Sequence, residues 1–282
     1  MLALCCTIPA WAQNNEILRG DVNYDGQVTP TDISSLIDYL LNGVWGDEPV
    51  TESQTFTVNG VSFTMVPVEG GTFMMGATAE QGSAIHSDEK PTHEVTLSDF
   101  YIGETEVTQA LWLAVMGSNP SDFTGDLKRP VERVSWDDCQ EFIAQLNALT
   151  GETFRLPTEA QWEFAARGGN KSQGYKYAGS NDIDAVAWYS GNNGYVTLRV
   201  GVLSPNELGL YDMSGNVCEW CNDWYDDYSD AAQTDPAGRA EGYRRVYRGG
   251  CWSGSAVCCR VSYRSSSLPA ERDGAIGLRL AL

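Results

Sequence analysis

Residues 155–169 read Arg-Leu-Pro-Thr-Glu-Ala-Gln-Trp-Glu-Phe-Ala-Ala-Arg-Gly-Gly and contain clear helix signals. Thr158, followed three residues later by Gln161, forms a capping-box pattern in which each side chain bonds the other residue's backbone N–H. Gly168 and Gly169 are expected to end the helix, because glycine readily adopts the backbone conformation found at helix C-termini. The stretch therefore predicts a short helix with defined ends.

The sequence on the N-terminal side of this helix predicts strands, turns and one further helix. Residues 55–66 flank Asn59-Gly60, a pair that favours a two-residue hairpin turn. Residues 94–102 read as a continuing strand, and Ser135 begins a second helix with a capping pattern like the first. No βαβ alternation is present, and the rest is rich in turn residues. We therefore expect an α+β fold with much irregular structure.

Charge limits the classes of partner. The 282 residues carry a formal net charge of −20, with only 18 lysines and arginines. Nucleic-acid binding needs clustered cations, so we expect no nucleic-acid partner. The acidic excess is compatible with solubility and with calcium binding.

The first twelve residues, MLALCCTIPAWA, predict export of the chain. An apolar run ends in Ala10-Trp11-Ala12, a pattern typical of signal-peptide cleavage sites. The usual basic start is absent, so we interpret residues 1–12 as a truncated signal peptide; the alternative is a buried N-terminal strand. The expected location is the cell surface, the periplasm or the medium, and association with the cell envelope fits it.

Removal of residues 1–12 leaves six cysteines in a setting that permits disulfides. Six cysteines allow fifteen pairings. The chain has two histidines and neither is near a cysteine in sequence, so a zinc site is not expected. The cysteines are Cys139, Cys218, Cys221, Cys251, Cys258 and Cys259.

Residues 13–52 contain one calcium-loop pattern. Oxygen-bearing side chains and a sharp-turn glycine, Gly26, fall at the spacing with which such loops curl around the ion. Apolar residues at helical spacing follow in residues 33–41. The segment resembles a single dockerin repeat; the alternative is an acidic turn without an ion. The predicted ligands are Asp21, Asn23, Asp25, Gln27 and Asp32.

A series of motifs in a fixed order covers residues 55–282 and resembles the sulfatase-modifying, formylglycine-generating enzyme family. That family uses a variant of the C-type lectin fold, which the resemblance implies for this chain. The motifs are Gly71-Thr-Phe-Met-Met-Gly, Glu106-Val-Thr, Pro130-Val-Glu-Arg-Val-Ser-Trp, the stretch at residues 155–169, Asn206-Glu-Leu-Gly-Leu-Tyr-Asp-Met-Ser-Gly-Asn-Val, Arg248-Gly-Gly and Ile276-Gly-Leu-Arg-Leu.

The resemblance also implies a structural calcium ion and a disulfide. The calcium ligands would be the Asp212 side chain, the Gly215 and Val217 carbonyls and the Glu219 carboxylate, which are hard oxygen donors. The alternative is that the two carboxylates only bond the nearby backbone. Relatives without the enzyme activity carry cysteines at the places of Cys221 and Cys259, which implies a disulfide between these two.

The family's catalytic cysteine pair is not matched. The enzyme holds copper with two cysteines, because thiolates select Cu(I). Its first cysteine position corresponds to Gly254, and its second falls near Cys258 or Cys259. Cys251 stands where the family has a serine, and pairing it with Cys258 would give a spacing that the family does not use. We therefore expect no catalytic residues, no bound copper and no enzyme activity.

Residues 244–282 resemble the variable region of proteins diversified by retroelements, which mutate adenines in a template. A frame stays fixed in such regions, here Arg248-Gly-Gly, Trp252, Arg260-Val-Ser-Tyr-Arg264, Pro269 and Ile276-Gly-Leu-Arg279. The residue types between are all reachable from AAC codons by adenine changes, and Cys251 fits too. The predicted variable positions are Cys251, Ser253, Gly254, Ser255, Val257, Cys258, Ser265, Ser266, Ser267, Leu268, Asp273, Gly274 and Ala275.

The resulting hypothesis is an exported display protein that binds a protein or glycan through this region. Trp252, Tyr247 and Tyr263 are either ligand-contacting anchors or half-buried supports. Two alternatives stay open: a copper-dependent oxidase of the family's type, and an envelope structural protein with the same fold. The plainest reading of the region is an ordinary set of surface loops.

Overall fold

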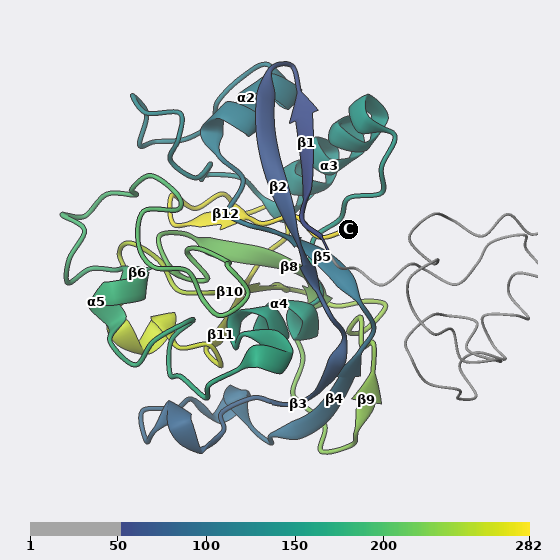
Figure 1. Ribbon diagram of the computed structural model, residues 1–282, viewed down its shortest axis with the longest axis vertical. Coiled ribbons are helices and arrows are strands. Elements are labelled where there is room, and N and C mark those ends of the chain that lie inside the picture. Colours follow the sequence, from purple (N-terminus) through teal and green to yellow (C-terminus); the bar gives the residue numbers. More distant parts are fainter. Residues whose placement is uncertain (1–51) are drawn as a thin grey trace, which may run out of the picture. The chain divides into compact units, whose positions relative to one another are not determined.

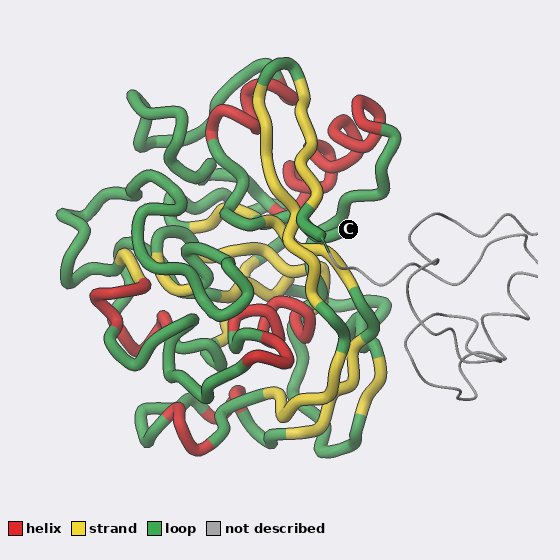
Figure 2. The backbone as a smooth tube through the Cα atoms, in the orientation of Figure 1, coloured by secondary structure: helices red, strands yellow, loops and turns green. Residues whose placement is uncertain are grey.

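The computed structural model describes residues 52–282. The predicted signal peptide and the calcium loop and helix at residues 21–41 lie outside this range. Within it, no helix is both long enough and apolar enough to cross a membrane. Loops and turns connect short strands and a few helices, as Figure 2 shows, so the predicted α+β fold with much irregular structure is confirmed.

The predicted hairpin is present. Strands β1 (Gln54–Val58) and β2 (Val61–Val68) pair in antiparallel register, and β5 (Phe100–Gly103) extends the sheet on the other side of β2. Asn59 and Gly60 both have positive φ, 48° and 82°, which is the conformation of a type I′ turn.

The prediction of a single strand at residues 94–102 is wrong. Two strands occur there, β4 (His93–Leu97) and β5, and they belong to different sheets. Ser98 breaks the run, because its N–H and its hydroxyl both donate to the Asp235 carboxylate at 2.7 Å. Strand β4 instead pairs with β3 (Gly71–Met75) and with β9 (Gln233–Thr234).

A four-stranded sheet with the order β11-β10-β8-β12 lies at the centre of the domain (Figure 1). Strand β8 (Cys218–Trp224) pairs antiparallel with β10 (Arg245–Arg248) and parallel with β12 (Ile276–Leu278), and β11 (Arg264–Ser267) pairs with β10. Both neighbours of the central strand therefore come from the C-terminal part of the chain.

Helices pack on both sides of this sheet, α2 (Gln109–Met116) and α3 (Trp136–Thr150) on one side and α4 (Glu159–Ala166) on the other (Figure 1). Strand β8 separates two hydrophobic clusters, because Trp220 contributes to the first and Cys221 to the second. Short elements complete the domain: α5 (Ile183–Val186), β6 (Ala187–Trp188) and β7 (Ser214–Gly215).

The two predicted helix starts are confirmed. Ser135 forms a capping box with Asp138, and Thr158 forms one with Gln161. Helix α2 was not predicted, although Thr108 accepts the Leu111 N–H at 3.2 Å and Gly117 ends the helix at φ 73°. The helix escapes prediction because its eight residues are mostly apolar and show no amphipathic period.

Four buried arginines join the C-terminal segments to the core. Each forms an ion pair with a buried glutamate from an earlier part of the chain. The pairings are Arg248 with Glu163, Arg260 with Glu89, Arg264 with Glu159, and Arg279 with Glu219. The Arg260 and Arg264 pairs are bidentate, with N···O distances of 2.6–2.7 Å.

Replacing Arg260 with methionine is expected to lower the free energy of unfolding by about 3–5 kcal/mol, because the Glu89 carboxylate stays buried without its partner. Urea unfolding measures the change. Arg272→Met is the control, since Arg272 pairs with Asp138 at the exposed surface and its loss should change the midpoint of unfolding little. Equal losses in the two variants would contradict the proposed importance of the buried pair.

Candidate functional site

The three C-terminal segments that hold the predicted variable positions are residues 252–258, 265–268 and 273–275, and we call them together the variable surface. The Trp252 indole N–H donates to the Gly274 carbonyl at 2.9 Å and joins the first segment to the third. The Ser265 hydroxyl donates to the Tyr247 hydroxyl at 3.0 Å, which attaches the second segment to β10. The first and third segments, which are far apart in sequence, therefore lie side by side.

Most of the predicted variable positions are at least partly exposed, and two are buried, Cys251 and Ser267. Cys251 packs in the first hydrophobic cluster, and Ser267 donates to Glu271 at 2.6 Å. The exposed or half-buried positions are Ser253, Gly254, Ser255, Val257, Cys258, Ser265, Ser266, Leu268, Asp273, Gly274 and Ala275.

Most predicted frame residues are buried, whereas most predicted variable positions are exposed or half-buried. The four frame arginines are the ones that form the buried ion pairs, and the apolar frame residues lie in the core. Trp252 and Tyr263 are half-buried. The Trp252 ring packs edge-on against Phe123 at a centroid distance of 4.9 Å, and Tyr263 packs against His86 at 5.3 Å. These two rings therefore support the surface from within.

The turn implied to bind calcium is tightly folded, with positive φ at Asp212, Gly215 and Asn216. Asp212 Oδ2 accepts the Gly201 N–H at 2.7 Å, whereas its buried Oδ1 has no hydrogen-bond partner within residues 52–282. That free oxygen fits a cation ligand. Glu219 is engaged differently, because its carboxylate accepts from the Arg279 guanidinium at 2.7 Å and from the Trp162 indole N–H at 2.6 Å.

A third carboxylate, Glu106, lies beside this turn. It accepts the Val217 N–H at 3.0 Å and the Asn216 amide at 2.7 Å. Burial, together with the charges of Asp212 and Glu219, raises the pKa of Glu106 well above its usual range. Burial also raises the pKa of Asp212 to about 6. Three buried carboxylates thus share one guanidinium, and the turn carries excess negative charge.

All six cysteines of the described residues are free thiols. The implied disulfide between Cys221 and Cys259 is not formed, because Cys221 lies in the second hydrophobic cluster and Cys259 in a third, with Tyr177. The implied pairing therefore does not describe this structure.

Cys251 instead lies next to Cys218, a neighbour that sequence spacing did not indicate. Both belong to the first hydrophobic cluster. The Cys218 thiol stabilises the Cys251 thiolate and lowers the pKa of Cys251 to about 6, against the opposing effect of burial. The Cys251 sulfur also lies 3.3 Å from the Ser253 hydroxyl. The antiparallel pairing of β8 with β10 brings the two thiols together, which only the register reveals.

Comparison with known proteins identifies the family. The model described as the sulfatase-modifying factor enzyme 1-like domain matches residues 51–282. The chain belongs to this family. Variable protein 1 of Treponema denticola has the same fold with a TM-score of 0.74 and 36% identity, covering 82% of this chain and 99% of its own. The predicted family and lectin-like fold class are thereby confirmed.

Two curated relatives differ in what their names state. The chaperone protein LppX of Paenibacillus barcinonensis is 37% identical over 278 residues, which cover 81% of this chain and 91% of the relative. The formylglycine-generating enzyme of Streptomyces coelicolor is 30% identical over 285 residues, which cover 77% and 88%. Family membership therefore includes proteins named as enzymes and proteins named otherwise.

Gly254 occupies the position of the family's first copper-binding cysteine. The Gly254 N–H donates to the Cys251 carbonyl at 2.9 Å, and the Gly254 carbonyl accepts the Ser190 N–H at 3.0 Å. A side-chain carbon added at Gly254 would lie 3.5 Å from the Cys251 sulfur. The thiol chemistry of this surface therefore centres on Cys251 and Cys218.

Alkylation of Cys251 by iodoacetamide is expected to rise with pH through a midpoint of about 6, because the thiolate is the nucleophile. Replacing Cys218 with alanine should move the midpoint toward the ordinary thiol value of about 8.5. Peptide mass spectrometry after short exposures measures both. Cys139 is the internal control, since burial raises the pKa of its thiol and shields it. An unchanged midpoint in Cys218→Ala would contradict the assigned role of Cys218.

Proposed function

We propose that this protein is an exported display protein that binds a protein or glycan through the variable surface, whose residues a retroelement diversifies. One observation carries the proposal: most predicted variable positions are exposed or half-buried, whereas most of the predicted frame is buried and its four arginines are paired. A surface built for substitution needs this division, because exposed changes alter recognition and buried changes unfold the core.

The support beneath the surface favours this function. Each variable segment adjoins an arginine whose ion pair fixes the backbone: Arg248 before the first, Arg264 before the second, and Arg279 after the third. Rigid anchors next to these segments keep the backbone path when side chains change. The likeness to a Treponema denticola protein named as a variable protein supports variation in this chain as well.

A library of variants tests the tolerance of the surface. Random substitution of the exposed positions Ser253, Ser255 and Asp273 is expected to change the free energy of unfolding by about 0.5 kcal/mol or less per site. Selection on a displayed library should also yield binders of a chosen protein, such as lysozyme. The control library randomises frame positions Arg248, Val261 and Leu278 and should be largely unfolded. Equal loss of folding in both libraries would contradict the proposal.

The coding DNA tests the diversification itself. We expect a nearby repeat that carries AAC codons at the variable positions and a reverse transcriptase gene beside it. Absence of such a template would contradict diversification. The library experiment would then test only whether this surface binds a ligand.

An oxidase is the second candidate, and the adjacent thiols of Cys218 and Cys251 favour it. Two thiolates suit Cu(I), although this pair differs from the family's catalytic pair. Titration of the reduced protein with Cu(I) against a competing chelator, together with an assay for aldehyde formation on a cysteine-containing peptide, tests the activity. Tight 1:1 binding with aldehyde product would replace the display proposal; failure of both would remove the oxidase.

We also propose that the turn around Asp212 binds calcium, with the unpartnered Asp212 oxygen and the carbonyls of Gly215 and Val217 as ligands. The excess of buried negative charge at Glu106, Asp212 and Glu219 supports a cation there. Bound calcium would supply positive charge and fix the turn that precedes β8.

Calcium should raise the free energy of unfolding by about 2.7 kcal/mol when its concentration is about 100 times Kd. Thermal unfolding of the full chain with calcium and with a chelator measures this. Asp212→Asn should lose most of the calcium-dependent shift, whereas Asp25→Asn in the separate predicted loop should not affect the unfolding of residues 52–282. A full shift retained in Asp212→Asn would contradict binding at this turn.

A further inference from the structure

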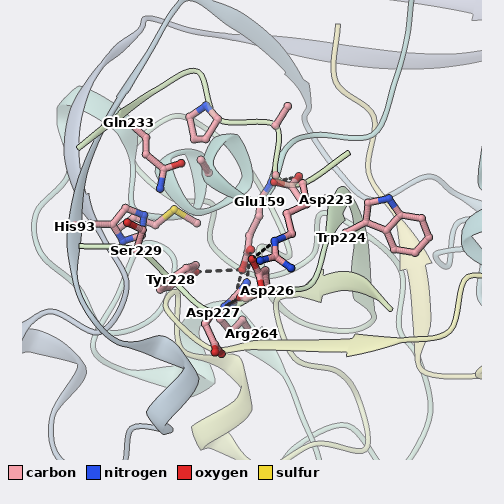
Figure 3. A pocket seen from close by; sticks show the side chains of 16 residues that line it. His93, Glu159, Asp223, Trp224, Asp226, Asp227, Tyr228, Ser229, Gln233 and Arg264 are labelled. Atoms are coloured by element: carbon pink, nitrogen blue, oxygen red, sulfur yellow. Dashed lines mark hydrogen bonds and ion pairs between the residues drawn. The ribbon is translucent and has the colours of Figure 1, made fainter. Parts of the chain in front are cut away.

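A cavity of about 330 Å³ lies at the end of β8, and neither the proposed binding surface nor the proposed calcium site uses it. Figure 3 shows its lining side chains. It is bounded by the start of α4, by β9 and by the loop that follows β8. Among the C-terminal residues, the frame residue Arg264 lines it.

The charges of the cavity wall do not balance. Four carboxylates line it, Glu159, Asp223, Asp226 and Asp227, against two guanidinium groups. Arg264 forms a bidentate pair with Glu159, and Arg239 lies 2.5 Å from Asp226. Two carboxylates remain, Asp223 and Asp227, and Asp227 is exposed to solvent.

Asp223 is the unusual member, because it is only 6% exposed. Its Oδ2 accepts the Glu159 N–H at 2.8 Å, at the first turn of α4. Within residues 52–282, no cationic side chain forms an ion pair with this carboxylate, and its Oδ1 lies beside Gly238 on the cavity wall. Burial, followed by the charge of Glu159, raises the pKa of Asp223 to about 7. A buried carboxylate without a cation is unfavourable, which a cationic ligand would relieve.

Apolar and aromatic groups form the rest of the wall. Met75, Pro236 and Ala237 offer aliphatic surface. The Tyr228 ring packs against His93 at a centroid distance of 4.8 Å and donates its hydroxyl to Glu159 at 3.1 Å, so it is held in place. The cavity therefore combines an aliphatic strip with a wall on which carboxylates outnumber guanidinium groups. Aromatic faces also attract cations.

We propose that this cavity binds an alkylammonium group, with the ammonium on Asp223 Oδ1 and the carbon chain against Met75, Pro236 and Ala237. The buried Asp223 carboxylate, which has no paired cation, and the aliphatic wall together select a primary amine on a short chain. A free amine and the side chain of a lysine share this chemistry. None of the residues that line the cavity is a predicted variable position, so diversification would leave the site unchanged.

The test measures binding to the full chain by calorimetry at pH 8, where Asp223 is ionised. n-Butylamine is expected to bind at least about 10-fold more tightly than n-butanol, because only the amine carries the charge. Equal affinity of the two compounds would overturn the proposal. This comparison uses the unmodified protein, so it decides even if a variant fails to fold.

Variants locate the site. Asp223→Asn keeps an oxygen for the Glu159 N–H and removes the charge, and it should weaken n-butylamine binding by about 10-fold or more. Asp227→Asn is the matched control, with the same charge change at an exposed wall position, and should stay within about twofold. Unchanged binding in folded Asp223→Asn would overturn the assignment. Nα-acetyl-lysine N-methylamide distinguishes a lysine side chain from a free amine as the natural ligand. Binding as tight as that of n-butylamine indicates a lysine side chain, and much weaker binding indicates a free amine.

Discussion

The pairing of buried arginines with buried glutamates is the interaction on which the rest of this structure depends. Arg248, Arg260 and Arg264 reach from the C-terminal segments to glutamates in α4 and in the 3₁₀ turn at Ser87–Glu89. Each pair is costly to break, because an unpaired charge would stay buried. The same contacts therefore hold the central sheet to α4 and set the positions at which the surface loops begin and end.

This arrangement gives variation and stability separate locations. The variable surface consists of short segments whose side chains are mostly exposed or half-buried, while the neighbouring arginines are buried. A change at Ser253 or Ser265 removes no buried partner, whereas a change at Arg264 leaves Glu159 uncompensated. Arg264 also lines the cavity beside Asp223, so this frame residue supports both the second variable segment and the cavity wall.

Much of this architecture could be predicted from the sequence. Capping boxes at Ser135 and Thr158 and the turn at Asn59-Gly60 are local signals, and each has the expected geometry. The separation of the frame from the variable positions follows from the motifs themselves.

Contacts between distant segments could not be predicted. The strand at residues 94–102 divides because Asp235, far away in sequence, bonds Ser98. The neighbour of Cys251 is Cys218 rather than Cys258, since strand register and not sequence spacing decides which thiols meet. The cavity combines the end of β8 with α4 and β9, an assembly that no single motif indicates.

The strand order of the central sheet has a consequence for how the protein is made. Strand β8 obtains its two partners, β10 and β12, from residues 245–278, which leave the ribosome after β8 and α4. The sheet cannot close before the predicted variable region has been synthesised, and the contacts that close it are long-range ones. A chain with substitutions in this region must therefore complete the core with the substituted segment. A substitution that damages the buried frame would be rejected at folding, before the domain could bind anything.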